Sequence, residues 1–435
     1  MQSRMFYVRL ISALYLATFL IRMSFGIASV GFVRWVPPED IGRDIYGILW
    51  ATASICEFIF ALIVGVLIDR YGRRGMLLFG LLIGAGSLIC TILTKNLVVM
   101  FLARGLLGIG AAAILVSSLA LLTDYAPKNK RGREMGAFDA INLLGWFVGF
   151  AAGFVLLGIF GEGRVYLLFI VGGGLAGFGL LYSLLNVKEP EKKCVTVEHI
   201  SLGMLRTVLL NRSVVLLIMP WLVVFIVIGS ALAFGPSEGS SDALNISWQR
   251  AAVAIVIIGA VLISTQLFFG RLSDKVGRMP VLAVGTLGIT GLMVSIAVLF
   301  FSTHGHGLHG AGAERFIVYV VIGLSLILAL AFGPSSLASL ADVADVKTRG
   351  MTMGLYSVVI TIGLSTGSIV VGFISEHAGP GAVVVFFLIS AAVMVTFVVL
   401  RFVDVKYWGQ NKASLERTFT DATDNIPDGK CKDQK

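Results

Sequence analysis

Three ionisable residues interrupt long apolar stretches in the first half of the chain: Arg22, Glu57 and Arg104. A charged side chain at the centre of a bilayer costs about 2.5–3.5 kcal/mol on insertion scales, so such residues mark binding sites or proton relays by default. A carboxyl group there can exchange a proton, because burial favours its neutral form while a nearby arginine favours its charged form. The three residues therefore predict a substrate and proton-coupling site. A permanent Arg–Glu pair that only fixes helices is the alternative.

Arg22 carries the information about the transported or bound compound. If Glu57 alone balances Arg22 and Arg104, the first half of the chain keeps a net positive charge. The planar fork of a guanidinium suits a carboxylate or a phosphate. An organic anion is therefore the favoured ligand, with a hydrophobic or drug-like compound and a neutral solute as the alternatives.

The composition shows what kind of elements must hold these charges. Hydrophobic residues make up 57% of the 435 residues and charged residues 14%, whereas a soluble domain has about 45–50% and about 25%. A helix needs about 20 apolar residues to cross a bilayer, and twelve stretches meet this requirement. The short third stretch and the tight break after residue 160 leave a count of eleven open. The predicted spans lie near 10–33, 45–68, 76–93, 97–123, 136–160, 163–187, 213–234, 251–270, 280–301, 316–341, 350–375 and 380–400.

The distribution of basic residues predicts the orientation of these spans. Most of the 34 Lys and Arg residues lie in the two end segments and in every second loop. Loops rich in Lys and Arg stay on the cytoplasmic side. The chain is therefore expected to be a multi-pass protein of the cell membrane with both termini cytoplasmic. The net charge of +9 then reflects topology, and nucleic acid is not an expected partner.

Two loops repeat one another about half a chain length apart. The first runs from Gly65 to Arg74 as GVLIDRYGRR, and the second from Gly270 to Arg278 as GRLSDKVGR. Both contain Gly, three residues, Asp, a basic residue, any residue, Gly and Arg. Six spans, a basic linker and six more spans in the same orientation indicate a parallel duplication of the kind found in transporters.

These paired loops, the six-plus-six layout and Arg104 followed by small residues resemble the major facilitator superfamily. The resemblance implies an all-α membrane protein with 12 transmembrane helices in two pseudo-symmetric six-helix bundles. We expect the bundles at 1–187 and 213–402, a cytoplasmic linker at 188–212, and a disordered cytoplasmic tail at 403–435. The resemblance also implies that the loops latch the two halves together and that Arg104 takes part in proton coupling. The latch residues would be Gly65, Asp69, Arg70, Gly72 and Arg73 in the first loop, and Gly270, Asp274, Lys275, Gly277 and Arg278 in the second.

Small residues and a proline shape individual spans. Gly145, Gly149 and Gly153 recur every four residues, a pattern typical of close helix packing. The pattern also resembles the antiporter motif of drug exporters, except that Phe150 stands where that motif has a proline. Pro334 predicts a kink in the tenth span, because proline removes a backbone hydrogen bond. Possible cavity-wall residues, partly by the resemblance, are Asn142, Trp146, Trp221, Gln266, Phe332 and Tyr356.

The expected function is secondary active transport of a small organic solute by alternating access, coupled to protons through Glu57 with Arg104 and with an organic anion as cargo. The alternative is a proton-driven exporter of drugs or hydrophobic compounds, and a channel or receptor is a more distant one. The sequence contains no nucleophile–base set and no phosphate-binding loop, so we expect no enzyme and no ATP drive. We expect no cofactor and no metal, and we interpret the external tract with His304, His306 and His309 as a glycine-rich loop. The partners are a small-molecule substrate, protons and the lipid bilayer, and the protein is expected to be a monomer.

Overall fold

The computed structural model describes residues 2–93, 95–125, 131–189, 212–238, 248–303, 312–343 and 349–424, and these ranges are helical with no strand. In lipid, a helix satisfies every backbone hydrogen bond within its own segment, so long apolar stretches fold in this way. In chain order the helices are α1 (Gln2–Trp35), α2 (Pro38–Ile41), α3 (Arg43–Tyr71), α4 (Arg73–Leu93), α5 (Leu97–Tyr125), α6 (Arg131–Phe160), the 3₁₀ turn η1 (Glu162–Arg164), α7 (Tyr166–Asn186), α9 (Arg212–Glu238), α11 (Trp248–Val276), α12 (Arg278–Thr303), α13 (Gly312–Ala329), α14 (Phe332–Val343), α15 (Arg349–His377) and α16 (Gly379–Asp424).

The helices match the twelve predicted spans. Within the described ranges, ten helices are long and apolar enough to cross a membrane. The other two spans, near 251–270 and 316–341, correspond to α11 and to the pair α13–α14. The tight break after residue 160 is a true helix end, because Gly161 has a φ of 74° and η1 separates α6 from α7. The count of eleven is therefore wrong.

The tenth span is broken where its proline predicts a kink. Helix α13 ends at Ala329, and α14 begins at Phe332, two residues before Pro334. Proline fits the first turn of a helix, where its missing N–H has no intrahelical partner. The proline therefore sits at the start of a new helix and ends the preceding one.

The repeat predicted from the loops extends to the packing inside each half. In the first half α1 packs on α6, and a Cβ added at Gly26 would lie only 2.9 Å from Cα of Gly149. In the second half α9 packs on α15, and a Cβ added at Gly229 would lie 2.6 Å from Cα of Leu364. Glycine is needed at these positions because any side chain would overlap the facing backbone. The predicted close packing around Gly149 is thus confirmed.

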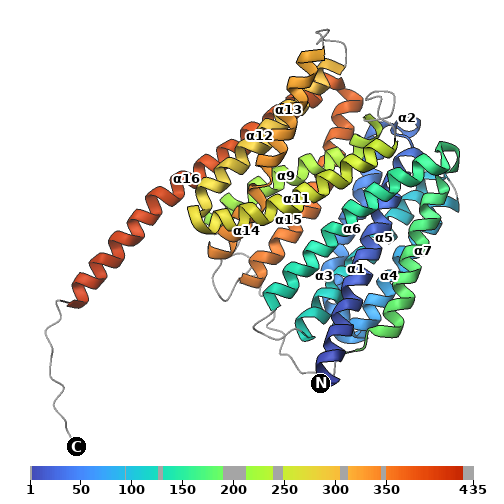
Figure 1. Cartoon of the computed structure of the whole chain (residues 1–435), viewed down its shortest axis with the longest axis horizontal. Coiled ribbons are helices and arrows are strands. Elements are labelled where there is room, and N and C mark those ends of the chain that lie inside the picture. Colours follow the sequence, from blue (N-terminus) through green and yellow to red (C-terminus); the bar gives the residue numbers. More distant parts are fainter. Residues whose placement is uncertain are drawn as a thin grey trace, which may run out of the picture.

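The two halves lie side by side, with α1–α7 in one group and α9–α16 in the other (Figure 1). Helix α3 packs on α15 and α6 packs on α11 across the boundary. The backbone N–H of Arg43 donates to Oε2 of Glu376 at 2.9 Å, and the rings of Tyr46 and Phe234 lie 5.5 Å apart. These contacts join the start of α3 to the ends of α15 and α9, at the end of the bundle where α2 lies. The two repeated glycine loops follow the C-terminal ends of α3 and α11, at the end of the bundle away from α2.

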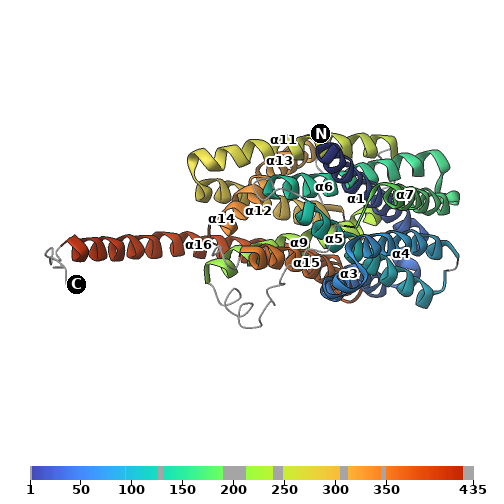
Figure 2. The ribbon, with the colours of Figure 1, turned by 90° about the horizontal axis from the view of Figure 1, so that it is seen from below.

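Helix α16 continues past the second bundle to Asp424, and both views show it leaving the other helices (Figures 1 and 2). The expectation of a disordered tail therefore differs from the structure at 403–424, and 425–435 lies outside the described residues. Between residues 410 and 424 the chain has neither Gly nor Pro. Ala, Leu, Glu, Arg and Lys in this segment are good helix formers. The polar composition that suggested disorder is equally compatible with a solvated helix.

Candidate functional site

Arg22 of α1 lies beside Glu57 of α3 and beside two residues of α6. Its Nη2 is 3.7 Å from Oε1 of Glu57. Its Nε donates to Oδ1 of Asn142 at 2.5 Å, and its Cζ lies 6.0 Å from the ring centre of Trp146. Glu57 therefore pairs with Arg22, whereas the sequence analysis expects it to act with Arg104. Asn142 and Trp146, which the sequence analysis expects in a cavity wall, belong to the same cluster.

The glycine spacing of α6 brings this cluster together. Asn142 and Trp146 are four residues apart and therefore share one face of the helix. Between them lies Gly145, where an added Cβ would approach Cβ of Arg22 to 2.8 Å. The missing side chain lets α6 approach α1 closely enough for Asn142 to reach the guanidinium.

The cluster holds its charges largely away from water. The side chain of Arg22 is 9% exposed and that of Glu57 is 20% exposed. A pair this deep is weakly screened by salt, so removing one partner leaves a costly uncompensated charge. Glu57 is the more exposed member of the pair. The arrangement can therefore exchange an ion pair for a neutral acid and an unpaired guanidinium.

Arg104 of α5 lies elsewhere in the first half. Its Cζ stacks 4.1 Å from the ring centre of Phe32 and 4.5 Å from that of Trp50. Its contacts in the described part of the chain are therefore aromatic, and Arg22 is the arginine that pairs with Glu57. Sequence reasoning missed Phe32 and Trp50. Their only signal is two aromatic residues at a depth similar to that of Arg104.

The two repeated loops adopt the same turn. Gly72 has a φ of 82° and Gly277 a φ of 105°, values that side chains disfavour and glycine accepts. The N–H of Gly72 donates to the carbonyl of Ile68 at 2.9 Å, and that of Gly277 to Ser273 at 3.1 Å. A single left-handed residue thus reverses the chain between consecutive helices in both loops.

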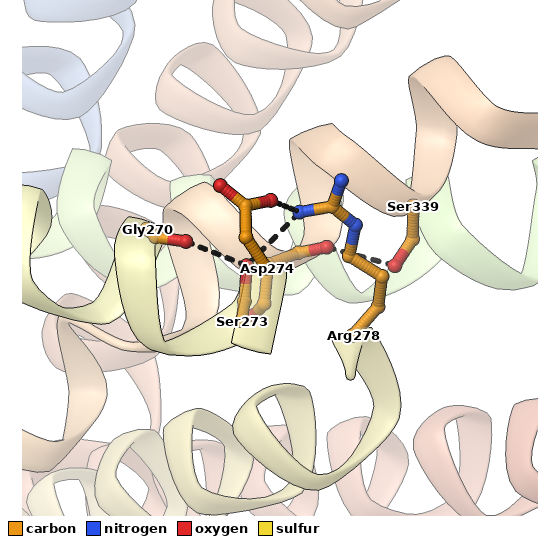
Figure 3. A network of polar contacts seen from close by, with 6 residues as sticks. Gly270, Ser273, Asp274, Arg278 and Ser339 are labelled. Carbon is orange, nitrogen blue, oxygen red and sulfur yellow. Dashed lines mark hydrogen bonds and ion pairs between the residues drawn. The ribbon is translucent and has the colours of Figure 1, made fainter. Parts of the chain in front are cut away.

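The arginine after each of these glycines is paired within its own half. Arg73 forms an ion pair with Asp124 at the end of α5. Arg278 pairs with Asp274 at 2.5 Å and donates to Oγ of Ser273 at 3.1 Å, with Ser339 of α14 close by (Figure 3). The other latch residues give less information. A Cβ added at Gly65 would meet open space, and one added at Gly270 would lie 3.8 Å from Cβ of Pro334. Arg70 and Lys275 are exposed, and the side chain of Asp69 is outside the described residues.

A glutamate that the sequence analysis did not single out caps the first loop. The carboxylate of Glu189 accepts from the backbone N–H groups of Arg73 at 2.8 Å and Arg74 at 2.7 Å. Negative charge is favourable at a helix N-terminus, where such N–H groups lack intrahelical partners. The cap therefore ties the chain after α7 to the start of α4.

The remaining predicted wall residues lie in the second half. Trp221 stacks on Phe225 with ring centres 5.4 Å apart and meets Phe332 edge-on at 5.1 Å. Trp221 and Phe332 are both buried, so in this structure they pack α9 against α14. The side chains of Gln266 and Tyr356 lie outside the described residues, as does the histidine tract.

The family model described as Major Facilitator Superfamily matches residues 14–331. This match covers well over half of the chain, so the chain belongs to the major facilitator superfamily and is a membrane transporter rather than an enzyme. A second model, described as PUCC protein, matches residues 246–432.

Individual relatives agree with the family. The multidrug resistance protein Stp of Mycobacterium tuberculosis is 26% identical over 394 residues, covering 76% of this chain and 69% of the relative. The solved D-xylose-proton symporter has a TM-score of 0.70 at 17% identity and covers 91% of this chain and 97% of its own. The nucleoside transporter NupG has a TM-score of 0.67 at 15% identity and covers 92% and 99%. At these identities the two structures support the twelve-helix fold alone.

Proposed function

We propose that the protein is a proton-coupled secondary transporter of a small organic anion, working by alternating access in the cell membrane. The observation that carries this proposal is the largely buried pair of Arg22 and Glu57, which joins α1, α3 and α6. An intramembrane ion pair is costly and is kept where a substrate or proton path needs it.

Exchange of partners at Arg22 is the coupling step. When Glu57 takes up a proton, its carboxyl group becomes neutral and the attraction to Arg22 falls. Arg22 then remains held by Asn142, and its free N–H groups can bind the carboxylate or phosphate of a substrate. Release of the proton on the other side restores the ion pair and displaces the anion. Proton and anion would therefore move together, and Arg104 would serve outside this exchange.

The contacts between the halves suggest which conformation this is. With both termini placed in the cytoplasm, the end bearing α2 is external, and the halves touch there through Arg43 and Glu376. The structure would then be closed to the outside. The glycine loops would form the latch in the opposite state, with Asp69, Asp274 and their basic neighbours exchanging partners between halves. The two moving units would be residues 1–187 and 213–402. The transporter would work as a monomer, and it would not bind nucleic acid.

Export of a drug-like compound is the second candidate, and one feature of the site favours it. The rings of Trp146 and Phe150 stack at 5.5 Å with an angle of 24° between them, next to Arg22. Stacked aromatic faces bind flat apolar compounds well. The likeness to a multidrug resistance protein supports this candidate too.

A transport assay with matched variants tests the proposal. Purified protein is first screened by thermal shift against carboxylates, phosphate esters and cationic drugs, and any hit is used for counterflow in liposomes. Glu57→Gln should abolish accumulation driven by a proton gradient while exchange continues. Arg22→Ala should weaken anion binding by more than about tenfold, as expected for a hydrogen bond to a charged group. Glu162→Gln, which removes the exposed partner of Arg34 at 3.9 Å, is the control and should change neither.

The opposite results separate the two candidates. If Glu57→Gln removes both accumulation and exchange, or neither, the pair is structural and the coupling role is wrong. If cationic drugs are transported and Arg22→Ala leaves their apparent affinity unchanged, the hypothesis of an organic-anion substrate fails. Export of drug-like compounds is then the favoured function.

A further inference from the structure

Arg104 is a buried cation whose partners in the described part of the chain are aromatic rings. The residue is 7% exposed, and its guanidinium lies over Phe32 and Trp50. Its Nε is buried with no hydrogen-bond acceptor among the described residues. An arginine stays protonated in proteins, so the group cannot escape this position by losing its charge.

Stacking on two rings does not satisfy such a group. Aromatic rings attract the cation electrostatically, but they provide no oxygen acceptor for the guanidinium N–H groups. Desolvating a charge costs more than even a desolvated cation–π contact returns. The Nε–H of Arg104 therefore lacks an acceptor among the described side chains.

A small pocket at this position could hold such an acceptor. It lies inside the first half between α1, α4, α5 and α7, and Arg104 lines it together with the hydroxyl-bearing Ser29, Ser87 and Thr91. The hydroxyls of Ser87 and Thr91 donate to backbone carbonyls of Gly84 and Ser87 at 2.7 and 2.9 Å. Rotation about the C–O bond is enough to turn a hydroxyl proton from a carbonyl toward a ligand. The remaining wall includes Phe25, Leu88 and Phe169, which keep the pocket apolar apart from these groups.

We propose that this pocket binds a small monovalent inorganic anion, such as chloride, between Arg104 and the hydroxyls of Ser29, Ser87 and Thr91. The pocket is too small for an organic substrate, and it is distinct from the cluster of Arg22 and Glu57. The charge of Arg104, the hydroxyl donors and the apolar wall together fit a compact, weakly hydrated anion. The proposal does not depend on the substrate proposed above.

The position of this pocket gives the anion a structural role. The ring of Phe32 lies 6.0 Å from that of Tyr46, and Tyr46 contacts Phe234 of the second half at 5.5 Å. Fixing the Arg104 side chain therefore fixes the aromatic contacts through which the halves meet. Occupancy should stabilise the conformation in which this end is closed.

Thermal unfolding of the full-length protein in detergent tests the proposal. The unfolding temperature is measured in sodium chloride and sodium bromide against sodium gluconate at equal ionic strength. Chloride and bromide should raise the unfolding temperature in a saturable way, and gluconate, which is too large for the pocket, should not. Arg104→Gln should remove the response, whereas Arg34→Gln, at the outer end of α1, should keep it.

A gentler pair of variants covers the case in which Arg104→Gln does not fold. Ser29→Ala and Thr91→Val retain the pocket and the charge but each remove one hydroxyl, and each should raise the apparent chloride dissociation constant about tenfold. Equal unfolding temperatures in chloride and gluconate would overturn the proposal. So would a chloride response that persists unchanged in Arg104→Gln or in both hydroxyl variants.

Discussion

Replacing Gly47 with alanine should open the end of the molecule at which the two halves meet. Gly47 lies on α3 against α15. A Cβ there would be 3.1 Å from the carbonyl carbon of Ser368 and 3.4 Å from Cα of Gly372, and still closer to the oxygen of Ser368. All three atoms belong to backbone, which cannot rotate away as a side chain can. The contact can be relieved only by moving α3 and α15 apart.

The size of the effect follows from the cost of overpacking. Inserting a methyl group into a tightly packed contact typically costs about 1–3 kcal/mol. Alanine also favours a helix over glycine by about 0.5–1 kcal/mol, but this gain is the same in every conformation in which α3 is helical. The closed conformation should therefore lose about 1–3 kcal/mol relative to the one open at this end. At about 1.4 kcal/mol per factor of ten, the ratio of the two populations should change about 5- to 150-fold.

Distance measurements between spin labels detect this change. Labels are placed at Asp40→Cys on α2 and Ala378→Cys after α15, both exposed positions, in a background without the native cysteines. Gly47→Ala should add or enlarge a population at longer distance. Gly174→Ala on α7, which has open space around the added Cβ, is the control and should leave the distances unchanged. A folded Gly47→Ala protein with unchanged distances would refute the reasoning, because the two helices would then absorb the methyl group without separating.

Two further substitutions separate packing within one half from contact between halves. Gly367→Ala places a Cβ 2.7 Å from the carbonyl carbon of Ile226, between α15 and α9 of the second half. It should lower the unfolding temperature, at a cost of about 1–3 kcal/mol, and leave the spin-label distances unchanged. A shift in those distances would contradict the conclusion that this contact lies within one half. Glu189→Gln weakens the cap on α4 and should destabilise the protein by about 0.5–2 kcal/mol, the range for lost helix caps. Thermal unfolding measures this loss against the control variant Glu162→Gln. Equal unfolding temperatures for the two variants would show that the cap does not stabilise the protein.

The local features of the fold could be read from the sequence. Each span was predictable because membrane crossing depends on the summed hydropathy of about 20 neighbouring residues. Gly72 and Gly277 stood out because they recur at matched positions of two loops half a chain apart, and the structure shows the reason, since each reverses the chain at a positive φ. Helix α16 was harder, because a polar segment without Gly or Pro is compatible with both a solvated helix and disorder.

The candidate site could be predicted only in part. The cost of a charge in lipid marked Arg22, Glu57 and Arg104 without any alignment. It did not reveal that Arg22 and Glu57 form the pair, nor that Arg104 lies against the rings of Phe32 and Trp50. Depth in the membrane follows from position along a span, but the direction in which a side chain points changes by about 100° with each residue. An error of one residue in the register of a helix therefore changes which neighbour it faces.

The sequence by itself determined that the chain is built of membrane-crossing spans, that its two halves repeat, and that Gly72 and Gly277 stand at matched positions in the repeated loops. Those properties depend on nearby residues and add up along the chain. Only the tertiary structure decided that Asn142 holds Arg22, that Glu189 caps α4, and that the halves touch at the end bearing α2. These contacts join segments more than a hundred residues apart, and they depend on how closely helix backbones can approach. Glycine has no Cβ, and this allows two helix backbones to approach closely where they meet.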